Sequence, residues 1–164
     1  MIIITGASRG IGKYLMEEFL KLNKKVIGTY FKESSEFEKN PLMYRLDITD
    51  IRGTEKFAED IKEYLNEIVL INCAGNNYNS FAHKSSPEEW SKVINTNLTG
   101  TYNMIRVLLP VMREQGYGRI INFSFSYSIS SICNIYLCLF LSVKYVVLYP
   151  VTCRTFGKIY LSVF

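Results

Sequence analysis

The chain has 164 residues, and 48% of them are hydrophobic, which favours a single domain with a buried core. Its formal net charge of +4 is modest, and no stripe of Lys and Arg alternates with aromatic residues, which argues against nucleic-acid binding. Every Asp and Glu lies at or before Glu114, and the only charges after Arg119 are Lys144, Arg154 and Lys158. The basic character therefore belongs to the C-terminal part of the chain.

The cysteines and the N-terminus indicate the compartment of the protein. None of the four cysteines forms a C-x-x-C pair, and His83 is the only histidine, so we expect free thiols and no metal site. The first residues, MIIITGASRG, lack a basic region and reach turn residues after three isoleucines, which is too soon for a secretory signal. We therefore expect a cytoplasmic protein.

Apolar spacing predicts an alternation of strands and helices along the front part of the chain. Runs of β-branched and other apolar residues predict strands at 2–4, 25–30, 43–46, 68–71 and 119–123. Apolar residues at helical spacing predict helices at 10–23 and 51–65, and one long helix or two in succession from 87 to about 114. This alternation is typical of a Rossmann-like, doubly wound parallel α/β sheet with helices on both faces. Such a sheet binds ligands beyond the carboxyl ends of its strands.

The last of these helical segments has a defined start in the sequence SPEEW. Ser86 is expected to cap it, Pro87 takes its first position, and Glu89 is placed to reach back to Ser86 in a capping box. Tyr78 and His83 fall in the polar loop before this helix, and the sequence assigns them no role.

The motif TGASRGIG follows the first strand and opens the first helix. Its glycines, Gly6, Gly10 and Gly12, permit positive φ angles and the close approach of a pyrophosphate, and a helix N-terminus favours an anion. A glycine cluster alone is a weak signal. Its place between a strand and a helix, at the start of an alternating chain, predicts dinucleotide binding.

Further motifs follow in order, namely Asp47 in LDITD, Asn72-Cys73-Ala74-Gly75, Asn97 in NTNLTG, and GYGRIINFS. Together with TGASRGIG they resemble the short-chain dehydrogenase/reductase family over about residues 1–124, and most of all its 3-oxoacyl-acyl-carrier-protein reductases. Cys73 departs from the family's NNAG. The resemblance implies a dinucleotide-dependent oxidoreductase that acts on a carbonyl, with Asn97 in the catalytic site. It also implies cofactor binding by Gly6, Ser8, Arg9, Gly10, Ile11, Gly12, Asp47, Asn72, Ala74 and Gly75.

Two of these residues also have a purely structural explanation. On the sequence alone, Asp47 could be a turn residue or the cap of the next segment. Asn72 could serve backbone groups at the end of a strand.

The choice of cofactor is predicted from charge. Recognition of NAD usually places a carboxylate after the second strand, for the ribose 2′-hydroxyl, whereas NADP needs a cation for its 2′-phosphate. The chain reads GTYFKES there, with no acid directly after Tyr30, and Arg9 and Lys32 are placed to approach a phosphate. We therefore expect NADP(H), with NAD(H) as the less favoured alternative.

The resemblance breaks near Phe125, which stands where the family has its catalytic serine. The family's proton donor is a tyrosine followed four residues later by a lysine, and no Tyr-x-x-x-Lys occurs in the chain. At family spacing these two residues fall on Cys138 and Ser142. We therefore expect a dinucleotide-binding domain over 1–124 and an apolar, non-family tail over 125–164, as a frameshift, a readthrough or an altered splice would produce.

Three interpretations of the function stay open. An active reductase of a carbonyl, such as a 3-oxoacyl thioester, would need another proton donor, with Tyr127 or Tyr136 as the nearest candidates. A catalytically dead subunit would bind nucleotide, or pair with its own kind or with an intact relative, through the Trp90–Met112 helices. The third interpretation is a non-functional truncated product. A membrane span over 132–151 is disfavoured because it would bury Lys144.

Overall fold

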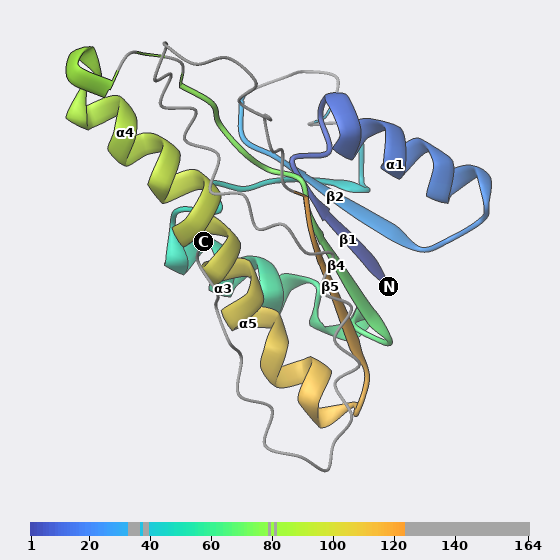
Figure 1. Ribbon diagram of the computed structural model, residues 1–164. Coiled ribbons are helices and arrows are strands. Elements are labelled where there is room, and N and C mark those ends of the chain that lie inside the picture. Colours follow the sequence, from blue (N-terminus) through green and yellow to red (C-terminus); the bar gives the residue numbers. More distant parts are fainter. Residues whose placement is uncertain (33–36, 38–39, 79, 81, 124–164) are drawn as a thin grey trace.

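The computed structural model describes residues 1–32, 37, 40–78, 80 and 82–123, and these form one five-stranded parallel sheet (Figure 1). The strand order is β3-β2-β1-β4-β5, and every neighbouring pair is parallel. The strands are β1 (Ile2–Thr5), β2 (Val26–Tyr30), β3 (Met43–Arg45), β4 (Ile68–Asn72) and β5 (Gly118–Asn122). The predicted Rossmann-like parallel sheet is thereby confirmed.

Helical segments connect the strands, and their bounds refine the prediction. They are α1 (Gly10–Lys21), α3 (Ile51–Asp60), the 3₁₀ helices η1 (Lys62–Tyr64) and η2 (Ala82–Lys84), α4 (Pro87–Ile94), the π-helix η3 (Asn95–Gly100) and α5 (Thr101–Glu114). The helix predicted at 51–65 ends as an α-helix at Asp60 and continues as a 3₁₀ turn. The elements α4, η3 and α5 follow one another directly and form one long helical segment (Figure 1).

Helices cover both faces of the sheet because successive strand residues point to opposite sides. On one side, Ile3 and Leu70 pack in a core with Phe57 of α3 and Leu108 of α5. On the other side, Ile4 and its neighbours pack with α1. The members of that second core are Ile4, Ala7, Met16, Val26, Tyr30, Met43 and Ile71. The isoleucine run of β1 therefore supplies both cores.

The strand ends that matter for a ligand lie at one edge of the sheet. Thr5 at the end of β1 is paired with Asn72 at the end of β4, and Asn72 is paired with Asn122 at the end of β5. From β1 the chain runs outward in one direction to β2 and β3, and in the other to β4 and β5. Ligands of such sheets bind beyond the carboxyl ends of the strands at this reversal, here β1 and β4.

Several predicted features of the tail lie outside the described residues. These are the serine position at Phe125, the alternative proton donors Tyr127 and Tyr136, and the segment 132–151. Within the residues that the structure does describe, no helix combines the length and the apolar character needed to cross a membrane. That same part of the chain holds no group of three or more His, Cys, Asp or Glu side chains suited to a metal ion.

Candidate dinucleotide-binding site

The glycine loop between β1 and α1 is closely packed at two of its three glycines. Gly6 and Gly10 have positive φ angles of 67° and 56°, a region that side chains other than hydrogen rarely adopt. A Cβ on Gly12 would lie 2.4 Å from the carbonyl oxygen of Gly6, and a Cβ on Gly6 would lie 2.7 Å from the Cα of Ala74. A Cβ on Gly10 would meet no atom of the described residues within 4 Å. The turn is therefore tight inside and open outside, where a ligand would approach.

The N-terminus of α1 has features that favour binding of an anion. Arg9 is the N-cap residue, and it makes no side-chain cap hydrogen bond. The first turn of α1 holds no acidic residue either. The first N–H groups of a helix carry the positive end of its dipole, and they need an acceptor. Ser8, Arg9 and Ile11, which the resemblance assigns to the cofactor, lie at this end of the helix, and free N–H donors of this kind suit a pyrophosphate.

The loop after β4 is fastened to the end of β1. The hydroxyl of Thr5, which is fully buried, accepts hydrogen bonds from the N–H groups of Cys73 and Ala74, both at 3.1 Å. Burial raises the pKa of the Cys73 thiol to about 12, so at neutral pH this residue is a neutral side chain. The cysteine that departs from the family motif therefore adds no charge beside the glycine loop.

The Asn72 side chain is buried at the end of β4 and is not exposed at the ligand edge. Its side-chain amide donates to Oδ1 of Asn122 at 2.8 Å, and the residue is only 5% exposed. Within the described residues, its own Oδ1 is buried and has no hydrogen-bond partner. The contact ties the ends of β4 and β5 together through two side chains, and not through the backbone groups that the sequence had suggested as its partners.

Asn97 lies in the π-helix, where the long helical segment departs from regular α geometry. Its Oδ1 accepts the N–H of Asn76 at 2.8 Å, and its Nδ2 donates to the carbonyl of Asn76 at 2.9 Å. A Cβ on Gly75 would lie 3.3 Å from the same Oδ1. Both amide atoms of Asn97 are thus used to hold the backbone of the loop that follows β4.

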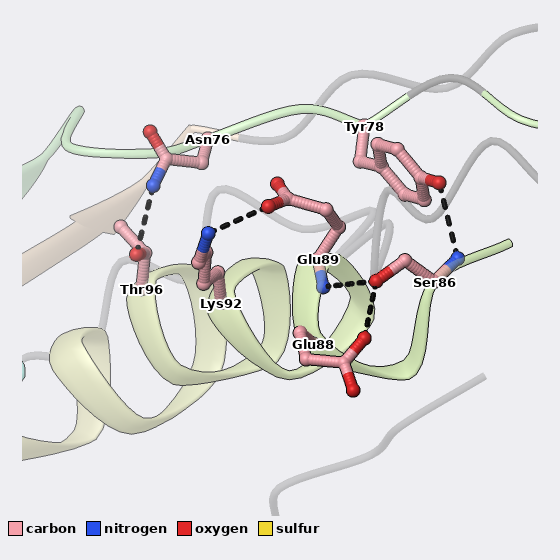
Figure 2. A network of polar contacts seen from close by, with 7 residues as sticks. All are labelled: Asn76, Tyr78, Ser86, Glu88, Glu89, Lys92 and Thr96. Atoms are coloured by element: carbon pink, nitrogen blue, oxygen red, sulfur yellow. Dashed lines mark hydrogen bonds and ion pairs between the residues drawn. The ribbon is translucent and has the colours of Figure 1, made fainter.

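The side chains of the same loop reach the helix at two further points (Figure 2). Nδ2 of Asn76 donates to the hydroxyl of Thr96 at 3.0 Å, and the Tyr78 hydroxyl accepts the N–H of Ser86 at 3.1 Å. Asn76 and Tyr78 were missed as site residues. The only signal in the sequence was their place in a polar loop directly after the Asn-Cys-Ala-Gly motif.

The predicted capping box is half correct. Ser86 does cap α4, because its hydroxyl accepts the N–H of Glu89 at 3.3 Å. The Glu89 carboxylate does not reach back; it pairs with Lys92 at 2.6 Å instead (Figure 2). The N–H of Ser86 that it would have bound is already satisfied by Tyr78, so a tertiary contact replaces the local one.

Asp47 occupies a turn after β3 at the same edge of the sheet. Its Oδ1 accepts the N–H of Thr49 at 2.9 Å and the Thr49 hydroxyl at 2.7 Å, while Asp50, not Asp47, caps α3. Nδ2 of the buried Asn103 donates to the carbonyl of Ile48 at 3.0 Å. The sequence missed Asn103, whose signal is a polar residue among the apolar positions of α5. Its bond fixes the Asp47 turn to the long helix.

The end of β2 lies at the same edge of the sheet, between the glycine loop and the Asp47 turn. The carbonyl of Thr29 accepts the N–H of Ala7 at 2.8 Å, and the carbonyl of Tyr30 accepts the N–H of Leu46 at 2.7 Å. The two residues after the strand, Phe31 and Lys32, are both exposed. The glycine loop, the end of β2 and the Asp47 turn are thus neighbours, and the first acid after β2 is not adjacent to the strand.

A parallel sheet with a tight glycine loop between its first strand and its first helix is the architecture of dinucleotide-binding folds, and comparison with known proteins agrees. The family model of short chain dehydrogenases matches residues 1–133. The chain therefore belongs to the short-chain dehydrogenase family, and the resemblance drawn from its motifs is confirmed.

Relatives of known activity are similar over the same part of the chain. The acetoacetyl-CoA reductase of Rhizobium meliloti is 33% identical over 128 residues, which cover 74% of this chain and 53% of that protein. The 3-oxoacyl-acyl-carrier-protein reductase of Vibrio harveyi is 34% identical over 127 residues, which cover 73% of this chain and 52% of that protein. The chain thus spans about half the length of these curated relatives.

Solved structures of the family superpose on the described fold. ElxO with NADP bound is 30% identical, with a TM-score of 0.68, and the match covers 78% of this chain and 59% of that one. A short chain dehydrogenase from Leptospira borgpetersenii with bound NAD+ is 28% identical, with a TM-score of 0.70, covering 82% and 54%. Relatives of both cofactor types therefore share this fold.

Proposed function

We propose that the chain is the nucleotide-binding part of an NADP(H)-dependent short-chain reductase, acts in the cytoplasm, and is impaired in hydride transfer. The observation that carries the proposal is the glycine loop, which is closed by backbone contacts at Gly6 and Gly12 and open at Gly10. The uncapped start of α1 supports a pyrophosphate there. Bound NADP(H) would supply the hydride; the chain's own residues would bind and orient it.

The preference for NADP(H) rests on charge at the end of β2. Arg9 and Lys32 are cations at this edge, and no carboxylate directly follows Tyr30 to receive a ribose hydroxyl. A phosphate between two cations gains charge-assisted hydrogen bonds that a hydroxyl cannot match. Asp47 lies one strand further along the edge and is occupied by Thr49.

The proposed impairment follows from the sequence, in which Phe125 takes the serine position and no Tyr-x-x-x-Lys occurs. Asn97, the remaining residue of the proposed catalytic set, holds the backbone of Asn76 with both amide atoms. It would therefore act by positioning the loop after β4. The proposed substrate, a 3-oxoacyl thioester, is taken from the named activities of the two relatives.

Titration of the purified chain with NADPH and NADH, followed by addition of acetoacetyl-CoA, tests the proposal. We expect NADPH to bind more tightly than NADH, and no oxidation of NADPH after the thioester is added. Arg9→Ala should weaken NADPH binding about tenfold more than NADH binding, since one charge-assisted contact is lost. Arg52→Ala, an exposed cation on α3, is the matched control. Tighter NADH binding would contradict the cofactor choice, and turnover would contradict the impairment.

A second candidate function is a catalytically dead subunit that pairs with its own kind or with an intact relative through Trp90–Met112. Tyr102 on α5, a large aromatic residue of this segment that is 50% exposed, gives the candidate a test. Sedimentation of the chain should then show a dimer that Tyr102→Glu dissociates. Tyr64→Glu, on η1 and 62% exposed, should leave the dimer intact. A monomer at all concentrations, alone and with an intact reductase, would reject this candidate.

A further inference from the structure

Two segments of the chain lie beyond the carboxyl ends of strands, on either side of the glycine loop. One is the turn 47–49 after β3, and the other is the loop 73–76 after β4. Because β2 and β1 stand between β3 and β4, these two strands lie three strand spacings apart, about 14 Å. The ladder of the sheet ends at Arg45 and at Asn72, so the residues beyond are held by other contacts.

Both segments are bonded to one helical segment, formed by α4, η3 and α5 in direct succession (Figure 1). Nδ2 of Asn103 donates to the carbonyl of Ile48 at 3.0 Å and to the carbonyl of Thr49 at 3.3 Å. Asn97 holds the backbone of Asn76 with both of its amide atoms. The two asparagines are six positions apart in the sequence. One element therefore holds both sides of the ligand edge.

The turn after β3 also packs closely on this helical segment. Asn103 is only 5% exposed, so water cannot readily replace its bonds to the turn. A Cβ on Gly100 would lie 2.6 Å from the side chain of Ile48, so this glycine lets the turn approach the helix. Within the turn, Oδ1 of Asp47 accepts both the N–H and the hydroxyl of Thr49. A change at Asn103 should therefore shift the turn as a unit.

A ligand that contacts both segments depends on the distance between them. In folds of this kind a dinucleotide lies across the reversal of strand order, with one mononucleotide half on each side. Because the two halves are joined covalently, the second half binds at a high effective concentration only when both segments have the right separation. A half-ligand binds on one side only, so its affinity does not depend on that separation.

We propose that Asn103 is a positioning residue that sets the distance between the two sides of a dinucleotide site. The inference rests on the proposed function and deepens it, because it names a buried residue that controls binding of the whole ligand without touching either half. Asn103 acts through the turn that it holds. Its role therefore differs from that of Arg9, which would contact the ligand directly.

Three ligands test this assignment: NADPH, 2′,5′-ADP as the adenosine half, and reduced nicotinamide mononucleotide as the other half. Asn103→Leu keeps the size of the side chain and removes the donor. We expect it to weaken binding of NADPH about tenfold, and binding of each half-ligand less than about twofold. A general loss of structure would weaken all three ligands, and damage to one side would weaken NADPH and one half-ligand equally. Either result, or unchanged NADPH binding, would overturn the proposal.

Three further variants keep the test independent of how well Asn103→Leu folds. Gly100→Ala presses a methyl group against Ile48 and should also weaken NADPH alone, by about threefold. Asn103→Gln keeps an amide donor and should recover most of the lost affinity. Val111→Ala removes packing from the same core about two turns further along α5. It should be less stable and yet bind all three ligands as the unaltered chain does.

The unaltered chain separates failure of this inference from failure of the proposed function. If the folded, unaltered chain binds neither NADPH nor 2′,5′-ADP, the proposed function is wrong. If it binds both, and Gly100→Ala and Asn103→Leu bind NADPH as tightly as it does, only the role of Asn103 is wrong.

Discussion

The glycine loop after β1 and the π-helical turn at 95–100 are two places beside the site where the backbone departs from regular strand or α-helix. The first is held by close packing of backbone against backbone, with Gly12 against Gly6 and Gly6 against Ala74. The second is held by amide side chains, with Asn97 bound to the backbone of Asn76 and the side chain of Asn76 bound to Thr96. The glycine loop therefore depends on residues without a side chain, whereas the π-helical turn depends on side-chain hydrogen bonds.

This difference predicts unequal tolerance to substitution. In the glycine loop a single added methyl group meets backbone that cannot move aside, so the cost is steric and immediate. In the π-helical turn a lost amide leaves polar groups that water can partly satisfy, because Asn76 is exposed. Substitutions in the glycine loop should therefore cause a large loss of stability, whereas substitutions in the π-helical turn should cause a moderate loss.

Gly12→Ala should have the largest effect. Its Cβ would lie 2.4 Å from the Gly6 carbonyl oxygen, so we expect a loss of about 4 kcal/mol of stability, or failure to fold, together with loss of NADPH binding. Gly10→Ala is the matched control. It has only the cost of a positive φ angle, about 1–2 kcal/mol, because its surroundings are open. Equal urea midpoints for the two variants would break the contrast between packed and open glycines.

Thr5→Val should have the next largest effect, because it removes the contact that joins the glycine loop to the loop after β4. The N–H groups of Cys73 and Ala74 would lose their shared acceptor, at a cost of about 2–3 kcal/mol in urea unfolding. Thr5→Ser keeps the hydroxyl and should recover most of that stability. A valine variant as stable as the serine variant would show that the hydroxyl does not hold the two loops together.

Asn97→Ala tests the π-helical turn. It removes two hydrogen bonds to the backbone of Asn76, and we expect a loss of about 1–2 kcal/mol and faster hydrogen exchange at the Asn76 amide. Thr99→Ala, at an exposed position of the same π-helix, should change neither measurement. Unchanged exchange at Asn76 in the Asn97 variant would mean that packing, not the amide pair, holds the turn.

Alkaline pH tests Cys73, which lies in the loop after β4 that the glycine loop and the π-helical turn both contact. Burial raises the pKa of Cys73 from 9.0 to about 12, so the unfolded chain loses this proton first and stability should fall between pH 9 and 12. Cys73→Ser lacks this contribution and should lose less stability over that interval. Tyr44, whose pKa is also raised to about 12, is common to both proteins. Parallel stability curves above pH 9 would show that the thiol ionises freely in the folded state.

The succession of strands and helices along the chain and the place of the glycine loop could be predicted because both follow from local patterns. The run of isoleucines in β1 and the glycines after it need no information from elsewhere in the chain. The sites at Gly6, Asp47 and Asn97 followed from motifs, and the structure places them at one edge of the sheet. Their proposed contacts with a cofactor stay predictions.

The contacts that were missed join residues that lie in different elements, between 8 and 55 positions apart in the sequence. The apolar spacing of 87–114 is continuous, so the local sequence pattern does not predict a π-helix. The π-helix occurs where Asn97 binds the backbone of Asn76, 21 residues earlier in the chain. Glu89 fits the capping-box pattern, but Tyr78 had already taken the group it would bind. Asn103 acts on the turn after β3. Sequence patterns gave no means of pairing these partners.

The central position of β1 has a consequence for how the chain folds. β1 is synthesised before the other four strands of the described sheet, yet Ile2 pairs with Val26 on one side and with Val69 on the other. An isoleucine-rich strand must therefore keep one unpaired edge until β4 has been made, which exposes it to association with other chains. Bringing β4 to β1 closes a long loop, and the chain loses entropy before the contacts between these strands form. Folding should therefore be slow for a chain of this size. Production at low temperature or low expression rate should accordingly raise the soluble yield.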